Sequence, residues 1–135
     1  MPSDTEELDD EEAPRQQTPE EAFAAEFVAG AVEIIGDRWT MLILDHSIRG
    51  ATKFNEWCRR LNISPDVLTR RLEDLVTAGL MEKRPYRAEG QRERVGYYLT
   101  ALGRDAQPVL IALEEWAQRN DIRLGNAEDE DGSQA

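Results

Sequence analysis

Residues 52–79 read TKFNEWCRRLNISPDVLTRRLEDLVTAG, and this stretch decides the fold. Apolar residues recur at helical spacing twice within it, first from Phe54 to Leu61 and then from Leu68 to Val76. The second run follows Ser64-Pro65-Asp66, which supplies a helix N-cap, a proline for the first turn and an acid near the helix's positive end. With Thr52 as the N-cap of the first run, the pattern predicts two short helices joined by a tight turn.

Two further helices are predicted upstream of this pair. Thr18-Pro19-Glu20-Glu21 has the residues of a helix start, and the apolar stripe that follows ends at Gly36. The stripe consists of Phe23, Phe27, Ala31 and Ile34. Asp37 is predicted to cap the next helix, which is apolar on all sides from Trp39 to Leu44 and should therefore pack at the centre of a domain.

Downstream, residues 80–86 and 94–99 change to short extended runs, which predict a hairpin with a polar tip. Thr100 should cap one last helix, bent at Pro108. The order of elements predicts a mainly α chain with a small β-hairpin, namely a winged helix-turn-helix domain with added N- and C-terminal helices. In such a domain the helix at about 65–78 enters the major groove of DNA, and the wing at about 81–99 contacts backbone or minor groove.

A resemblance to a known family rests on short motifs spread along the chain. These are IGDRWTMLIL at 35–44, FNE at 54–56, ISP at 63–65, LTRRL at 68–72, AGL at 78–80, RPY at 84–86, YYLT at 97–100, LGR at 102–104 and PVL at 108–110. Their order and spacing resemble the HxlR family of bacterial and archaeal regulators over about residues 26–118. The resemblance implies a transcription regulator that binds double-stranded DNA as a homodimer, through helix one and the C-terminal helix.

The chain departs from the family pattern at three positions. Glu26 stands where many relatives carry a cysteine, so the resemblance does not support thiol sensing there. Gly96 replaces a residue that is often glutamate, and Asp66 puts negative charge where relatives often have a basic or neutral residue.

The candidate DNA-binding residues lie on the second helix of the pair and on the hairpin. A helical wheel turns Asp66, Arg70, Glu73 and Thr77 away from the leucine stripe, with Thr69 on the flank. The full candidate set is Ser64, Pro65, Asp66, Thr69, Arg70, Arg71, Lys53, Arg87, Arg92 and Arg94. Arg70 has the alternative of a solvated ion pair with Glu73 or Asp74, and Arg71 the alternative of bracing a neighbouring helix.

The formal net charge of −12 is confined to the two ends of the chain. Residues 1–21 hold nine acids against one arginine, and residues 121–135 hold five against one, whereas Arg49 to Arg94 holds eleven bases against seven acids. Because the ends are polar and charged, we expect disordered acidic tails at 1–17 and 121–135 around a DNA-binding domain at 18–120. The acidic tails and Asp66 also suit an alternative, a winged-helix protein-interaction module that does not bind DNA.

Several other classes of function find no support in the sequence. There is no glycine-rich phosphate loop or nucleophile motif, so an enzyme is not expected, and one cysteine with one histidine predicts no metal or other cofactor. Cys58 and His46 are interpreted as structural residues, with a redox role for Cys58 left open. The longest apolar run, Met41 to Leu44, is far too short to span a membrane, so the chain is expected in the cytoplasm; its effector is unknown.

Overall fold

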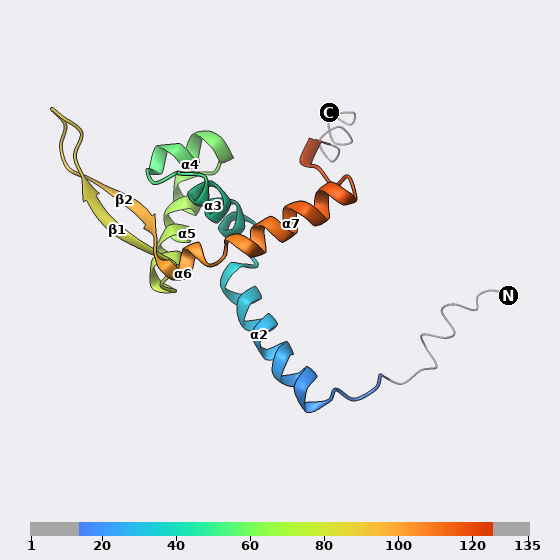
Figure 1. Cartoon of the computed structure of the whole chain (residues 1–135). Coiled ribbons are helices and arrows are strands. Elements are labelled where there is room, and N and C mark those ends of the chain that lie inside the picture. Colours follow the sequence, from blue (N-terminus) through green and yellow to red (C-terminus); the bar gives the residue numbers. More distant parts are fainter. Residues whose placement is uncertain (1–13, 126–135) are drawn as a thin grey trace. The chain divides into compact units, whose positions relative to one another are not determined.

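The computed structural model describes residues 14–125 and divides the chain into two units, with the boundary between Ile34 and Ile35. Figure 1 shows the elements in chain order. They are α2 (Pro19–Ile35), α3 (Arg38–Ile48), α4 (Phe54–Leu61), α5 (Pro65–Thr77), β1 (Met81–Tyr86), β2 (Arg94–Leu99), α6 (Ala101–Arg104) and α7 (Gln107–Arg119). The prediction of a mainly α winged helix-turn-helix domain with one hairpin is confirmed.

Helix α2 begins where the sequence predicts. The Glu21 amide donates to Thr18 Oγ1 at 3.1 Å, and the Thr18 amide donates to Glu21 Oε1 at 3.0 Å. This reciprocal capping satisfies two amides that have no partner within the helix. No residue of α2 is buried, and Phe23 and Phe27 stack edge to face at 4.9 Å.

Helix α3 is the central helix of the second unit, as predicted. Asp37 caps it by accepting from the Thr40 amide at 3.0 Å, and both Ile43 and Leu44 are fully buried. The buried Ser47 hydroxyl donates to the Ile43 carbonyl at 2.7 Å, so this polar group is not left without a partner.

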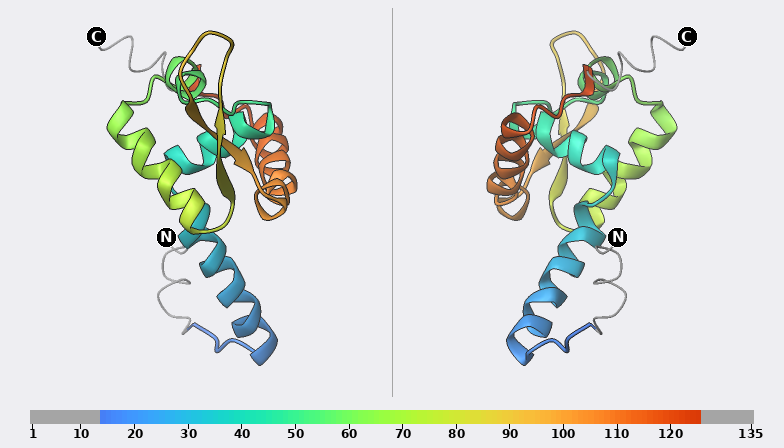
Figure 2. Two further views of the ribbon diagram at one scale, coloured as in Figure 1. Left: turned by 90° about the vertical axis from the view of Figure 1, so that its left-hand side faces the viewer. Right: turned by 90° about the vertical axis from the view of Figure 1, so that its right-hand side faces the viewer.

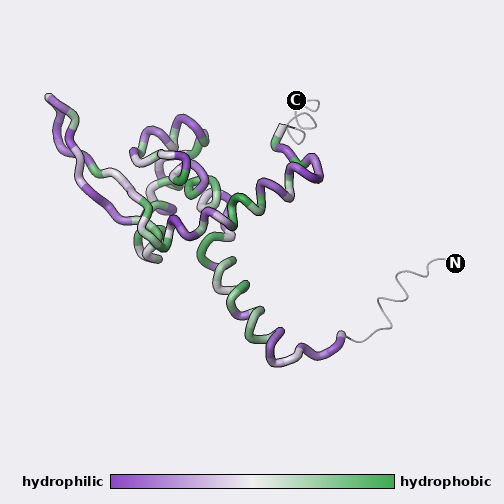
Figure 3. Tube along the Cα trace, viewed as in Figure 1, coloured by the Kyte–Doolittle hydropathy of each residue, from purple (hydrophilic) through white to green (hydrophobic). Residues whose placement is uncertain are grey.

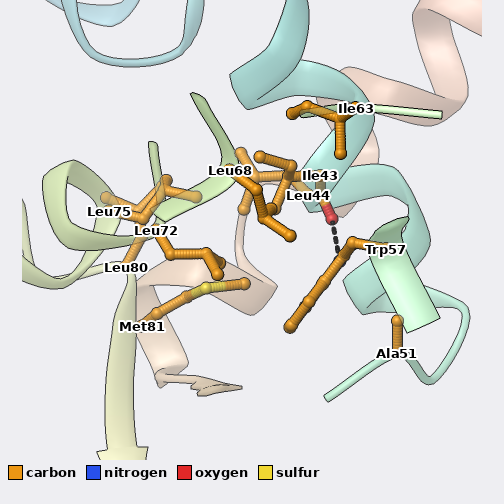
Figure 4. Close-up of a cluster of buried hydrophobic side chains, with 10 residues drawn as sticks. All are labelled: Ile43, Leu44, Ala51, Trp57, Ile63, Leu68, Leu72, Leu75, Leu80 and Met81. Atoms are coloured by element: carbon orange, nitrogen blue, oxygen red, sulfur yellow. Dashed lines mark hydrogen bonds between the residues drawn. The ribbon is translucent and has the colours of Figure 1, made fainter. Parts of the chain in front are cut away.

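The core of the second unit gathers side chains from α3, α4, α5 and β1 (Figure 4). Trp57 is its largest member, and its indole nitrogen donates to the Ile43 carbonyl at 3.3 Å. Leu68, Leu72 and Leu75 project from α5 into this cluster and are at most 1% exposed. Burial of each large side chain contributes about 1.5–3 kcal/mol. The leucine stripe therefore holds α5 against the domain by one face.

The turn between α4 and α5 is short because both helix ends are capped locally. Asn62 adopts a left-handed conformation, φ 55°, at the end of α4, and the Ser64 side chain accepts from the Val67 amide at 3.3 Å at the start of α5. The predicted start of α4 is wrong by one residue, since Lys53 and not Thr52 is its N-cap. The cause is Glu56, whose carboxylate accepts from the Thr52 and Lys53 amides, both at 2.8 Å.

The hairpin pairs β1 with β2 in antiparallel register, from Met81 opposite Leu99 to Tyr86 opposite Arg94. Gly79, with φ +86°, ends the preceding helix and permits the turn into β1. The Tyr97 amide donates to the Thr52 carbonyl at 2.8 Å, and Lys53 forms a bridge with Gly96. The wing is thus attached to the segment that begins α4.

The single bent helix predicted after Thr100 is wrong, because two helices replace it. Pro108 has no amide hydrogen, and its ring would collide with the carbonyl four residues earlier, at Arg104. Helix α6 therefore ends at Arg104, and α7 begins at Gln107 with Pro108 in its first turn, where no internal bond is needed. Within α6, a side chain at Gly103 would collide with the Leu80 carbonyl, which explains the glycine.

Candidate nucleic-acid interface

The N-terminal half of α5 presents a polar surface opposite its leucine stripe. Ser64, Pro65, Asp66, Thr69 and Arg70 are all exposed, while Leu68 and Leu72 on the opposite face are fully buried. The predicted candidates on this helix, Arg71 apart, therefore lie together on one accessible face. Free amides at the first turn of a helix favour an anion, and side chains at this position of a helix-turn-helix reach base edges.

Arg70 has no carboxylate within ion-pair distance among residues 14–125. The alternative partner Glu73 is instead paired with Lys83 of β1, at 2.9 Å between Nζ and Oε2. This pair joins α5 to the wing and was not anticipated from the sequence, because the two residues come close only in the folded domain. An exposed guanidinium without an ion-pair partner has its five donors available for a base or a phosphate.

Arg71 is used differently from Arg70. Its Nε donates to Asp37 Oδ2 at 2.8 Å and its Nη2 to Oδ1 at 3.3 Å, so both carboxylate oxygens are engaged. The Arg71 guanidinium lowers the pKa of Asp37 below its usual value, and the bond from the Thr40 amide acts in the same direction. Asp37 also caps α3, so the contact favours the bracing role that sequence analysis left open for Arg71.

The basic residues of the wing are exposed. Arg87 and Arg92 lie in the tip between the strands, and Arg94 begins β2 opposite Tyr86. The tip turns at Gly90, which has φ +76°. Figure 3 shows the tip as hydrophilic, and in both views of Figure 2 it extends toward the end of the unit where α5 begins.

Lys53 lies beside the wing at the start of α4. It is exposed, and its Nζ is 4.9 Å from the centre of the Tyr86 ring. A second cation–aromatic contact, Arg84 over Tyr98 at 3.9 Å, lies farther along the same hairpin. The Tyr98 ring occupies the space where a side chain at position 96 would project, so Gly96 makes this stacking possible. The only sequence signal for the contact between Arg84 and Tyr98 is the alternation of side chains along the strands.

Residues 14–125 contain no group of three or more His, Cys, Asp and Glu side chains placed to hold a metal ion. None of their helices has the length and apolar character of a membrane span. His46 is partly buried, and this burial lowers the pKa of its imidazole.

Comparison with known proteins agrees with this geometry. Curated relatives include an uncharacterised HTH-type transcriptional regulator of Mycobacterium tuberculosis, 37% identical over 94 residues, and the regulator YdeP of Bacillus subtilis, 31% identical over 103 residues. The alignment with the mycobacterial protein covers 70% of this chain and 58% of that protein. The alignment with YdeP covers 75% of this chain and 78% of YdeP. The match thus spans just over half of the mycobacterial relative.

Solved structures include the reduced form of the redox regulator HypR, with 29% identity and a TM-score of 0.62. Quinone-bound YodB from Bacillus subtilis has 26% identity and a TM-score of 0.58. The structural match with HypR covers 73% of this chain and 97% of HypR. The match with YodB covers 70% of this chain and 98% of YodB. Residues 34–123, about two thirds of the chain, match the model of the HxlR-like helix-turn-helix family. The chain therefore belongs to the HxlR-like helix-turn-helix family.

Proposed function

We propose that the protein is a sequence-specific DNA-binding transcription regulator, with α5 in the major groove and the β1–β2 hairpin on the backbone or minor groove. The observation that carries this proposal is the division of α5 into a leucine face inside the core and a polar face open to solvent. Arg70 on the open face can form two hydrogen bonds to one guanine. Ser64 and the Asp66 amide suit a phosphate, because the Val67 and Leu68 amides are bonded to Ser64 and Pro65 has none, while the Asp66 carboxylate can accept from a cytosine amino group.

The remaining candidates position the protein on the duplex. Arg87, Arg92 and Arg94 extend along the wing and suit phosphate or minor-groove contacts. Lys53 lies beside them at the start of α4. Contacts of this kind supply affinity and register but carry little sequence information. Base preference should therefore depend on α5, and the salt dependence of binding should depend mainly on the wing and Lys53.

The protein acts as a homodimer in this proposal. Apolar side chains are exposed along α2, with Phe27 65% exposed, and along α7, with Trp116 51% exposed. A cleft of about 630 Å³ between α3 and α7 is lined mainly by Met41, Leu42, Leu110, Leu113 and Leu124. Exposed apolar surfaces of this kind mark interaction sites, and a second copy would cover them.

The same proposal sets the domain boundaries and the cellular location. The DNA-binding domain with its dimerisation helices extends over 18–120, and the acidic tails at 1–17 and 121–135 lie largely outside the described residues. A regulator of this type acts on the chromosome, so the cytoplasm is the expected location in a prokaryotic cell. No enzymatic activity is part of the proposal, in keeping with the regulator names of its relatives.

Salt-dependent binding to duplex DNA tests the proposal. If a dimer neutralises about six phosphates, the logarithm of the association constant should fall with the logarithm of salt concentration with a slope near −5. The wild-type full chain is measured beside the double variant Arg87→Gln/Arg92→Gln, which should have a slope shallower by about 3 to 4 for four lost contacts per dimer. Arg119→Gln, at the exposed end of α7, is the matched control. A flat salt response with no protected DNA site would favour the protein-interaction alternative instead.

A further inference from the structure

A cleft of about 530 Å³ lies between the first turn of α4 and the hairpin. Its volume falls in the range of roughly 300–1,000 Å³ typical of small-molecule sites. The Tyr97 amide, which donates to the Thr52 carbonyl at 2.8 Å, ties the two walls together. The cleft thus lies between two segments joined by a backbone hydrogen bond, and its residues Phe54, Arg59 and Tyr86 are not among the proposed DNA contacts.

The lining of this cleft is positively charged. Lys53, Arg59 and Arg94 all contribute to it, and none has a carboxylate within 4.0 Å in the described part of the chain. Glu56 is the one acidic residue of the lining. Its carboxylate is held by the Thr52 and Lys53 amides at 2.8 Å each, and these bonds lower its pKa below the usual value. Three positive charges against one negative charge favour an anionic ligand.

Aromatic rings form part of the surface that a ligand would meet. Phe54 contributes from α4 and Tyr86 from β1, and Lys53 Nζ already lies 4.9 Å from the centre of the Tyr86 ring. A bare phosphate would leave these rings uncovered, whereas a flat aromatic molecule could stack on them. An arginine fork binds a carboxylate through two parallel hydrogen bonds.

We propose that this cleft binds a planar aromatic carboxylate, with its ring against Tyr86 and Phe54 and its carboxylate between Arg59 and Arg94. The site is separate from the base-reading face of α5. Its effect on DNA rests on the proposed function, because Lys53 and Arg94 also belong to the candidate DNA contacts. A bound carboxylate that neutralises Arg94 removes up to two phosphate contacts per dimer, and it thereby acts as an inducer that releases DNA.

Direct binding of a probe to the full chain without DNA tests the site. The probe is 2-naphthoate, titrated by calorimetry and by amide chemical shifts. We expect saturable binding with shifts confined to α4 and the hairpin, and Arg59→Gln should weaken it at least about tenfold through the loss of a charge-assisted bond. Tyr86→Leu should weaken it as well, and the surface variant Arg119→Gln should leave it unchanged.

Two further compounds test separately whether the flat ring and the negative charge of the probe are needed for binding. Cyclohexanecarboxylate has the charge without the flat ring, and 2-naphthalenemethanol has the ring without the charge. Both should bind more weakly than 2-naphthoate, and inorganic phosphate should compete poorly. Equal binding of 2-naphthoate to wild type and Arg59→Gln, equal affinity for cyclohexanecarboxylate, or no saturable binding at millimolar concentration would each overturn the proposal.

A DNA-binding experiment distinguishes failure of the ligand site from failure of the proposed function. Saturating 2-naphthoate should weaken wild-type binding to duplex DNA at least about tenfold and make its salt slope shallower by about 2. Arg59→Gln should bind DNA as wild type does and should need at least about ten times more probe for the same response. Probe binding in the cleft by a protein without affinity for DNA would refute the proposed function alone. DNA binding that the probe leaves unchanged would refute the inducer role.

Discussion

Helices α5 and α2 both carry large apolar side chains, but only α5 has them covered by its own unit. Leu68, Leu72 and Leu75 of α5 are buried in the core, and the side left exposed is polar. In α2 no residue is buried, and Phe23, Phe27, Val28 and Val32 are at least 60% exposed. A helix already anchored by one face can offer the other face to DNA. A helix with exposed apolar side chains is expected to bury them against another molecule.

The largest effect is expected from the anchored face of α5. Leu72→Ala removes a fully buried side chain and leaves a cavity, which should lower the free energy of unfolding by about 2–5 kcal/mol. Chemical denaturation monitored by tryptophan fluorescence measures it. Thr69→Ala, on the exposed face of the same helix, is the control and should change the free energy of unfolding little. Equal losses for the two variants would contradict the burial of α5 by one face only.

The exposed face of α2 should matter for association. Phe27→Ser places a polar group in the proposed dimer interface and should weaken dimerisation by about 2 kcal/mol, or roughly 30-fold. Sedimentation at several protein concentrations measures the change. Ala25→Ser, on the same helix, is the matched control for the added hydroxyl. If the wild-type chain sediments as a monomer at every concentration, the proposed role of α2 is wrong.

A smaller effect is expected where Arg71 braces α3 through Asp37. Asp37→Asn retains an oxygen that can cap the helix but loses the ion pair, so the cost should stay below about 1 kcal/mol for this partly exposed pair. The pKa of Asp37 is lower in the folded protein than the usual aspartate value of 3.8. Its stabilisation is therefore present above about pH 4 and is lost as the pH falls through the lower, folded-state pKa.

The pH dependence of unfolding checks this account. The difference between wild type and Asp37→Asn should be present at pH 7 and should shrink at acidic pH, where the wild-type carboxyl becomes protonated. Asp105→Asn, exposed between α6 and α7, serves as the control because its carboxylate forms no ion pair within the described residues. A difference that stays constant down to the acid limit would mean that the ion pair contributes nothing.

The smallest effect concerns residues 1–17, which hold seven acids and one arginine. Their removal should strengthen binding to nonspecific DNA by about threefold at low salt, because like charges no longer repel the duplex. The fold should be unaffected, since Thr18 still caps α2. Unchanged or weaker binding of the truncated chain, measured by fluorescence anisotropy, would count against electrostatic repulsion.

Much of the fold was predictable because its signals are local. Thr18, Asp37 and Ser64 each cap a helix where the sequence indicates, through bonds to amides three residues away. The two errors concern helix bounds, and each is caused by a side chain close in sequence to the bound. Glu56 shifts the start of α4, and Pro108 breaks the last helix although apolar spacing continues across the break.

The candidate site was less predictable because part of it depends on distant residues. Exposure of Ser64, Asp66 and Arg70 follows from the helical wheel. The roles of neighbouring charges do not follow from it. Arg71 meets Asp37, 34 residues earlier, and Glu73 meets Lys83 of the wing. These contacts distinguish Arg70, which has no ion pair, from Arg71, which is engaged, and no helical periodicity contains that information.

Selection of bound duplexes from a random DNA pool tests the central claim most directly. Wild type and Arg70→Ala are compared, with Arg119→Ala as the control. The account predicts that Arg70→Ala loses the preference for one base pair in each half-site, a change of about 1–3 kcal/mol, and retains the remaining preferences. Identical selected sequences for wild type and Arg70→Ala would contradict the placement of α5 in the major groove.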